Sequence, residues 1–162
     1  MEAVDHSLSW YPVSDEVKQL LKLAALHWDD TARSEPYIHQ ALDQAGDSPD
    51  VLIAAYRYAF YKNNNPFALD IANRVVQLVR STEQLPEDWE DLKPLIADRL
   101  DDPPIRLFLN AYSASGMVMA RMGDTETATT IAARVKDIDR KKEFGANTIF
   151  DILTNPGDDE DE

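Results

Sequence analysis

Apolar residues recur along most of this chain at steps of three and four, which is the periodicity of a helix with one buried face. The clearest case lies over residues 103–140, where two such stretches flank Gly123-Asp124. Gly123 suits the left-handed conformation that ends a helix, and Asp124 or Thr125 can cap the next one. The pattern therefore predicts two helices folded back on each other. Small residues stand where their faces should meet and would let the helices approach closely: Ala111, Ser115, Gly116, Ala128 and Ala132.

Weaker versions of the same pattern precede this pair. Ser48-Pro49 and Asn65-Pro66 each combine a capping side chain with a proline in the first helical turn. They predict the two helices of a unit over residues 49–80. An earlier helix pair is expected over residues 14–46. Its two helices would be capped by Ser14 and Ser34.

These elements predict an all-α fold. No stretch of β-branched residues alternates at period two, and the chain contains five glycines. We expect antiparallel helix-turn-helix pairs stacked in one domain over residues 14–153, with about eight helices in all. An amphipathic helix over 86–100, opened by Pro86, is expected within an insertion over 81–102. The other expected segments are an irregular lead-in over 1–13, a capping helix over 147–153 and an acidic tail over 154–162.

The spacing resembles the tetratricopeptide repeat (TPR). That family places an aromatic, a large, a small and an aromatic residue on a first helix and Ala-x3-Phe on a second. The positions that match here are Tyr112, Ser115, Gly116 and Met119, followed by Ala128 and Ala132, and earlier Val51, Ala54, Ala55 and Tyr58. The resemblance implies a short TPR-like superhelix. The match is irregular, because Val51 and Tyr112 lie 61 residues apart, which is not a multiple of the roughly 34 residues of that repeat.

Net charge narrows the range of partners. The 162 residues are 44% hydrophobic, which suffices for one globular domain with a core. Lys and Arg number 16 against 30 Asp and Glu, so the formal charge is -14. The five carboxylates of residues 158–162 leave about -9 on the rest of the chain. Such a surface repels phosphates and anionic lipids, so we expect neither nucleic-acid nor membrane binding.

The chain shows no signal for export or for membrane insertion. It contains no Cys, which excludes disulfides and thiol chemistry. The N-terminal sequence MEAVDHSLSW has neither the basic region nor the apolar stretch of a signal peptide. No run approaches the roughly 18 apolar residues of a membrane span. We therefore expect a cytoplasmic protein.

Candidate chemical groups are few. The three histidines are not spaced as paired metal ligands, and His27 with Asp29 and Asp30 straddles an expected helix end. The carboxylates of PEDWED, residues 86–91, stand at an expected helix N-terminus, where acidic residues are favoured in any case. No phosphate loop, nucleophile elbow or kinase signature is present. We therefore expect no catalytic residue, no metal and no cofactor, and a protein that is not an enzyme.

TPR-like proteins bind partners mainly in the groove lined by the first helix of each pair. The resemblance therefore implies a partner-binding groove at positions one turn aside from the packing face: Leu52, Tyr56, Phe60, Asn110, Ser113, Met117 and Arg121. One subfamily clamps a C-terminal carboxylate with Lys, Asn and Arg at fixed groove positions. Since those places hold Leu52, Tyr56, Ser113 and Met117 here, recognition of that type is not expected.

Two alternatives stay open for this stripe and for the function. Leu52, Tyr56 and Phe60 form a second apolar stripe that either faces a partner or is covered by the inserted helix or the N-terminal segment. The leading hypothesis is an adaptor or assembly chaperone that binds a protein segment, and the acidic surface favours a basic or amphipathic partner. The alternative is a homodimer or other homo-oligomeric subunit of a larger assembly.

Overall fold

The computed structural model describes residues 13–139, and over this range the fold is all-α, with no strand. It contains seven helices: α1 (Asp15–Leu26), α2 (Thr31–Ala45), α3 (Pro49–Tyr61), α4 (Asn65–Glu83), α5 (Trp89–Ala97), α6 (Pro103–Arg121) and α7 (Thr125–Ile138). The all-α class and the expected number of about eight helices are confirmed. The predicted capping helix over 147–153 and the acidic tail lie outside the described residues.

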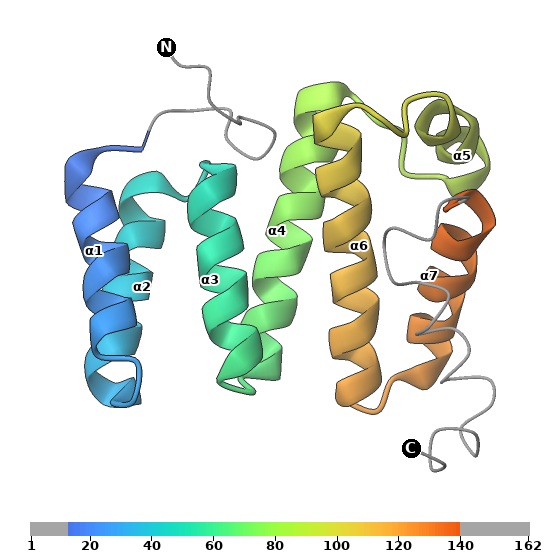
Figure 1. Ribbon diagram of the computed structural model, residues 1–162. Coiled ribbons are helices and arrows are strands. Elements are labelled where there is room, and N and C mark those ends of the chain that lie inside the picture. Colours follow the sequence, from blue (N-terminus) through green and yellow to red (C-terminus); the bar gives the residue numbers. More distant parts are fainter. Residues whose placement is uncertain (1–12, 140–162) are drawn as a thin grey trace.

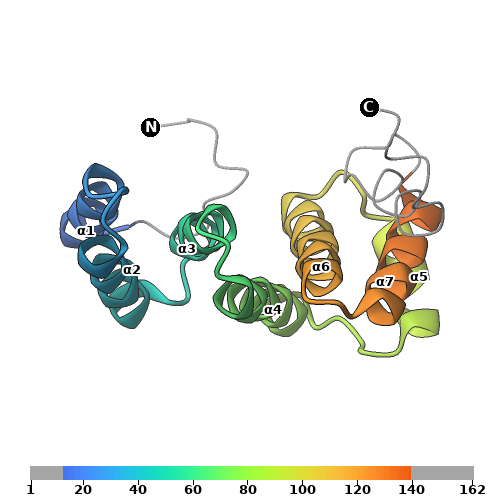
Figure 2. The same cartoon turned by 90° about the horizontal axis from the view of Figure 1, so that it is seen from below.

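The helices form antiparallel pairs that stand in a row (Figures 1 and 2). The pairs are α1 with α2, α3 with α4, and α6 with α7, and α4 packs against α6 to join the second pair to the third. The turns that close the three pairs lie at the same end of the row (Figure 1). We call α1, α3 and α6 the first helices of the pairs.

Two of the predicted caps act through their side chains. Ser14 accepts a hydrogen bond from the backbone N–H of Val17 at 3.2 Å, and Asp124 accepts one from the N–H of Thr127 at 3.2 Å. Each satisfies a backbone donor that has no partner inside its helix. Ser48 stands at the N-cap of α3, directly before Pro49, but its side chain forms no capping hydrogen bond. Gly123 has φ +94°, the left-handed conformation expected after the end of α6.

Three expected helix starts are wrong by a few residues. The N-cap of α2 is Asp30, so the helix already contains Ser34, which is buried, and Pro36 lies inside the helix instead of at its start. The N-cap of α4 is Asn64 and not the expected Asn65, and its side chain accepts a hydrogen bond from the backbone N–H of Phe67. The inserted helix α5 begins at Trp89 after Asp88, three residues beyond Pro86.

The core runs through the whole row and depends on close approach between helices. A Cβ on Gly116 would lie 3.0 Å from Cγ2 of Ile131, so α6 and α7 meet at a distance that only glycine allows without adjustment. The small side chains of Ala128 and Ala132 are buried on the facing side of α7. The expectation that small residues bring these two helices together is thus confirmed.

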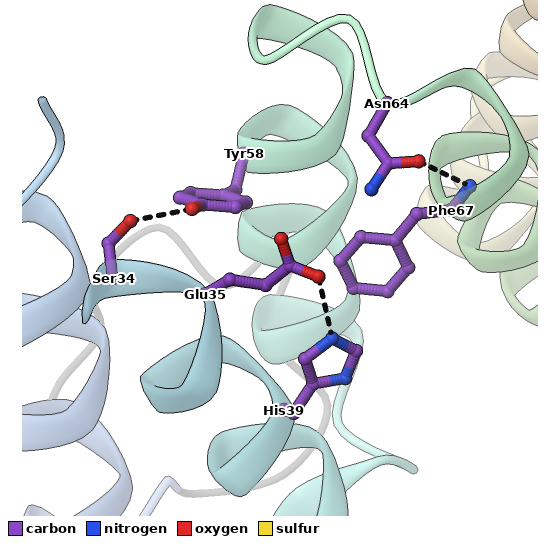
Figure 3. A network of polar contacts seen from close by, with 6 residues as sticks. All are labelled: Ser34, Glu35, His39, Tyr58, Asn64 and Phe67. Atoms are coloured by element: carbon purple, nitrogen blue, oxygen red, sulfur yellow. Dashed lines mark hydrogen bonds and ion pairs between the residues drawn. The ribbon is translucent and has the colours of Figure 1, made fainter. Parts of the chain in front are cut away.

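The first pair is joined to the second through polar and aromatic contacts. The Ser34 and Tyr58 hydroxyl groups lie 2.6 Å apart in a buried hydrogen bond between α2 and α3 (Figure 3). The ring of Trp28 meets Tyr58 edge-on at 5.3 Å, and Lys62 donates to the Trp28 carbonyl oxygen from above the indole ring. His39 stacks on Phe67 at 4.9 Å (Figure 3).

Candidate functional site

Tyr56 and Phe60 of α3 form a half-exposed aromatic pair. The two residues lie one turn apart, and their rings are stacked with centroids 5.6 Å apart. Residues Leu52 and Ala59 of the same helix are buried, so the aromatic pair borders the packing face of α3 without belonging fully to it. Tyr61 follows, with its ring nearly perpendicular to that of Phe60 and the two ring centroids 5.2 Å apart, and the residue is 68% exposed.

Arg121, the last residue of α6, completes the arrangement from a distant part of the sequence. Its guanidinium carbon lies 3.8 Å from the centre of the Phe60 ring, and its Nη1 donates to the Phe60 carbonyl oxygen at 3.3 Å. Cation–π contact of this kind favours a guanidinium over an aromatic face. Two of the predicted groove residues, 61 positions apart, are therefore brought together. We call Tyr56, Phe60, Tyr61 and Arg121 the aromatic–arginine cluster.

A small apolar core holds the cluster in place. Ala59 of α3, Ala68 of α4 and Val118 of α6 are fully buried against one another, at 0% exposure each. Tyr56 and Phe60 pack on the edge of this core. Because three helices contribute to it, the position of Phe60 relative to Arg121 is set by rigid elements and not by a loop.

The remaining predicted groove residues do not all reach the surface. Leu52 is 1% exposed within the main core, and Ser113 is 7% exposed with no hydrogen-bond partner for its Oγ. Their side chains are covered by packing, so we leave both out of the candidate surface. Met117 is half-buried one turn before Arg121 on the same face of α6. Asn110 is exposed, but it lies about 16 Å from Arg121 along the helix.

The inserted helix α5 packs elsewhere. Trp89 stacks on Tyr112 of α6 at 6.4 Å, and Arg134 of α7 lies over the Trp89 ring and donates to the Tyr112 hydroxyl at 3.0 Å. Lys93 forms an ion pair with Asp137 of α7. These contacts place α5 beside α6 and α7, at the end of the row opposite α1 (Figure 1). The insertion therefore does not cover Tyr56 and Phe60, and the N-terminal segment, the other expected cover, lies outside the described residues.

The electrostatics of the cluster come from one tyrosine and one arginine. Burial raises the pKa of Tyr56 to about 12, while the nearby positive charge of Arg121 lowers it in part. The Tyr56 hydroxyl therefore stays protonated throughout the physiological range and remains a hydrogen-bond donor. No carboxylate among residues 13–139 forms an ion pair with Arg121.

The histidines and clustered carboxylates take part in ordinary surface contacts. His39 forms a 3.1 Å contact with Glu35 one turn earlier (Figure 3), and His27 stacks on Tyr37 at 6.2 Å. No group of three metal-binding side chains occurs within the described part of the chain. Among its helices, none has both the length and the hydropathy that crossing a bilayer requires.

Sequence reasoning missed the exposed residues at the ends of the first helices. Leu26, Tyr61 and Met122 are 72%, 68% and 48% exposed. Each stands at the end of a first helix or directly after it, as Figure 1 lets the reader follow. The available signal was their place directly before the turn that closes each pair, since Tyr61 and Met122 otherwise continue the step of three from Tyr58 and Met119.

Comparison with known proteins does not assign an activity to this chain. No protein-family model matches the sequence, and no solved structure is similar to it. The chain is 28% identical over 145 residues to an uncharacterized 19.8 kDa protein in the nifW 5′ region of Azotobacter chroococcum mcd 1. That alignment covers 88% of this chain and 80% of the relative.

Proposed function

We propose that this protein is a protein–protein interaction module, an adaptor or assembly chaperone, that binds a segment of another protein on the aromatic–arginine cluster. The observation that carries the proposal is the contact of Arg121 with Phe60, which joins α3 to α6 and leaves the neighbouring Tyr61 68% exposed. Tyrosine, arginine and methionine are enriched where proteins bind one another. The TPR-like spacing of the helices supports the same use of the first helices.

The residues proposed to contact the partner are fewer than the groove residues expected from the sequence. They are Tyr56, Phe60, Met117 and Arg121, together with the newly found Tyr61. Asn110 lies near the middle of α6 on the same face as Arg121, about three turns before it, and would extend the surface if the bound segment is long. A cytoplasmic location is part of the proposal, on the sequence grounds given above.

The partner segment is proposed to be amphipathic and to carry carboxylates next to apolar residues. The whole chain is acidic, which favours a basic partner at long range, but charges beyond about 8 Å are largely screened at physiological salt. Among its own residues the cluster has one charged side chain, that of Arg121, and no carboxylate. Local charge therefore selects the contacts, and the amphipathic alternative fits the cluster better than the basic one.

Affinity capture from the native host tests the proposal. The captured protein is identified by mass spectrometry, and its binding to the purified chain is then measured by calorimetry. The variant Tyr61→Ala with Arg121→Ala removes two exposed side chains and is expected to weaken binding at least tenfold, since interface residues of these types contribute about 1–2 kcal/mol each. The matched control is Leu26→Ala with Leu95→Ala, two exposed apolar residues away from the cluster.

The outcome separates binding from folding. Tyr56→Ala with Phe60→Ala is expected to abolish capture while the helical circular-dichroism signal stays. If that double variant unfolds, the two rings act as core residues. If the Tyr61 and Arg121 variant binds as tightly as the control variant, the cluster is not the binding site.

One observation favours a second candidate function, the homo-oligomeric subunit. Leu26, Tyr61 and Met122 expose apolar side chains at the same end of the three pairs. An apolar edge of this kind also suits contact between copies. Light scattering over a dilution series distinguishes the two candidates, because a dimer that persists on dilution and is lost in Leu26→Asp with Met122→Asp supports the oligomer.

A further inference from the structure

The first helices of the pairs lack the acidic excess of the chain as a whole. Beyond its first turn, none of α1, α3 and α6 contains an Asp or Glu, whereas each contains a Lys or Arg: Lys22, Arg57 and Arg121. The chain as a whole has 30 acidic and 16 basic residues. With their first turns included, α1 and α3 are each neutral and α6 carries a charge of +2, and the basic residues nearest the cluster are Arg57 and Arg121 itself.

Two polar groups of the cluster, the Arg121 guanidinium and the Tyr56 hydroxyl, have hydrogen-bond donors without a partner among residues 13–139. A guanidinium has five N–H donors, and Arg121 uses one of them on the Phe60 carbonyl oxygen. The Tyr56 hydroxyl, close enough to feel the charge of Arg121, forms no hydrogen bond with another residue of 13–139. Arg57, exposed one turn before Tyr61, has no carboxylate partner in that range either. Carboxylates are the acceptors that satisfy such donors best.

We propose that the chain's own carboxylate-rich segment, residues 158–162, docks on the aromatic–arginine cluster and competes there with the partner. The segment DDEDE has five carboxylates and no cation, which complements the exposed guanidinium groups of Arg57 and Arg121. Its side-chain carboxylates accept hydrogen bonds from Arg121 and the Tyr56 hydroxyl. This inference rests on the proposed function, since it adds a regulatory occupant to the same surface.

The segment can reach the cluster. Asp139 ends the described chain at the far end of α7, a helix of 14 residues and therefore about 21 Å long. The 19 residues from Asp139 to Asp158 span up to about 65 Å when extended, which is several times that length. Covalent attachment also holds the segment at an effective concentration on the order of 1 mM, so weak contacts are enough to populate the docked state.

Paramagnetic relaxation enhancement tests the docking directly. The chain has no Cys, so Gly157→Cys in the full-length protein accepts a single nitroxide label next to the segment. We expect the label to broaden backbone amide signals of residues 56–61 and 117–122. The broadening should be lost in Arg57→Gln with Arg121→Gln, and lost when salt rises from about 0.1 M to about 1 M, where the screening length falls from about 10 Å to about 3 Å.

Two controls make the result decisive. Arg33→Gln removes an exposed arginine of α2 and should leave the broadening unchanged. Neutralising the segment, with Asn for Asp and Gln for Glu at 158–162, should abolish it. Broadening that is absent, that survives Arg57→Gln with Arg121→Gln, or that arises only between labelled and unlabelled copies would overturn the inference.

Failure here is separable from failure of the proposed function. If no broadening occurs but the partner still loses affinity in the Tyr61 and Arg121 variant, only the regulatory docking is wrong. If docking is real, the neutralised segment should also raise partner affinity, because the competitor is gone. Unchanged affinity alongside confirmed docking would mean that the partner binds elsewhere.

Discussion

The hydrogen bond between Ser34 and Tyr58 should contribute measurably to stability, because it is the buried polar link between the first two helix pairs. The two oxygens lie 2.6 Å apart, Ser34 is 0% exposed and Tyr58 is 5% exposed (Figure 3). Tyr58→Phe keeps the ring that packs edge-on against Trp28 and removes only the hydroxyl. Any loss of stability therefore reports the hydrogen bond and not the packing.

The expected magnitude follows from what is left behind. A buried donor or acceptor without a partner costs about 1–3 kcal/mol. Ser34 lies inside α2 and can turn its hydroxyl toward the backbone carbonyl four residues earlier, which limits the loss to the lower part of that range. We expect Tyr58→Phe to reduce the free energy of unfolding by about 1–2 kcal/mol, which lowers the Tm by about 2–8 °C for a chain of this size.

A double-mutant cycle provides the assay. Urea unfolding is followed by circular dichroism and tryptophan fluorescence for Ser34→Ala, Tyr58→Phe and the double variant. Because either single change leaves one hydroxyl buried alone, the double variant should lose less than the sum of the single changes, by about 1 kcal/mol. A coupling energy below about 0.3 kcal/mol is what independent sites show, and it would refute the role given to this hydrogen bond.

Further predictions concern Tyr56 and two glycines. Burial raises the pKa of Tyr56 to about 12, so its contribution to stability is complete below about pH 10, where an unfolded tyrosine ionises, and is lost as pH rises toward 12. Tyr56→Phe should remove part of the alkaline loss of stability between about pH 10 and about pH 12, whereas Tyr61→Phe should not; equal curves would contradict the burial. Gly123→Ala should destabilise by about 1–2 kcal/mol through backbone strain alone, because φ is +94° and no atom lies within 4 Å of the added Cβ. Gly123→Asn should restore most of that stability, since Asn tolerates the left-handed region. Gly116→Val should cost about 1–3 kcal/mol by overpacking against Ile131, and Gly116→Asn should give no recovery in the same unfolding assay.

Helix starts were predictable where one capping residue stood alone before a clear apolar run. Ser14 and Asp124 are examples, and both cap through their side chains. The start of α2 was not predictable, because several residues of capping type stand close together before its apolar run. They are Asp29, Asp30, Thr31 and Ser34. The helix also contains the exposed Pro36 beyond its first turn.

The candidate surface was predictable as a face of a helix but not as a set of accessible residues. Periodicity placed Leu52, Tyr56 and Phe60 on one stripe, yet it contains no information on how far α4 and α6 extend over that stripe. Packing buries Leu52 and leaves the aromatic pair at the edge. The contact of Arg121 with Phe60 depends on the angle between two pairs, which no local pattern encodes.

Site-specific photocrosslinking in the native host tests the central claim most directly. A photoreactive amino acid replaces Tyr61 in one version of the chain and Leu95, exposed on α5, in another. If the aromatic–arginine cluster holds a protein segment, the probe at Tyr61 should yield one discrete crosslinked product that disappears with Arg121→Ala, and the probe at Leu95 should not yield it. A product of equal intensity from both positions, or one from Tyr61 that is indifferent to Arg121→Ala, would contradict the claim.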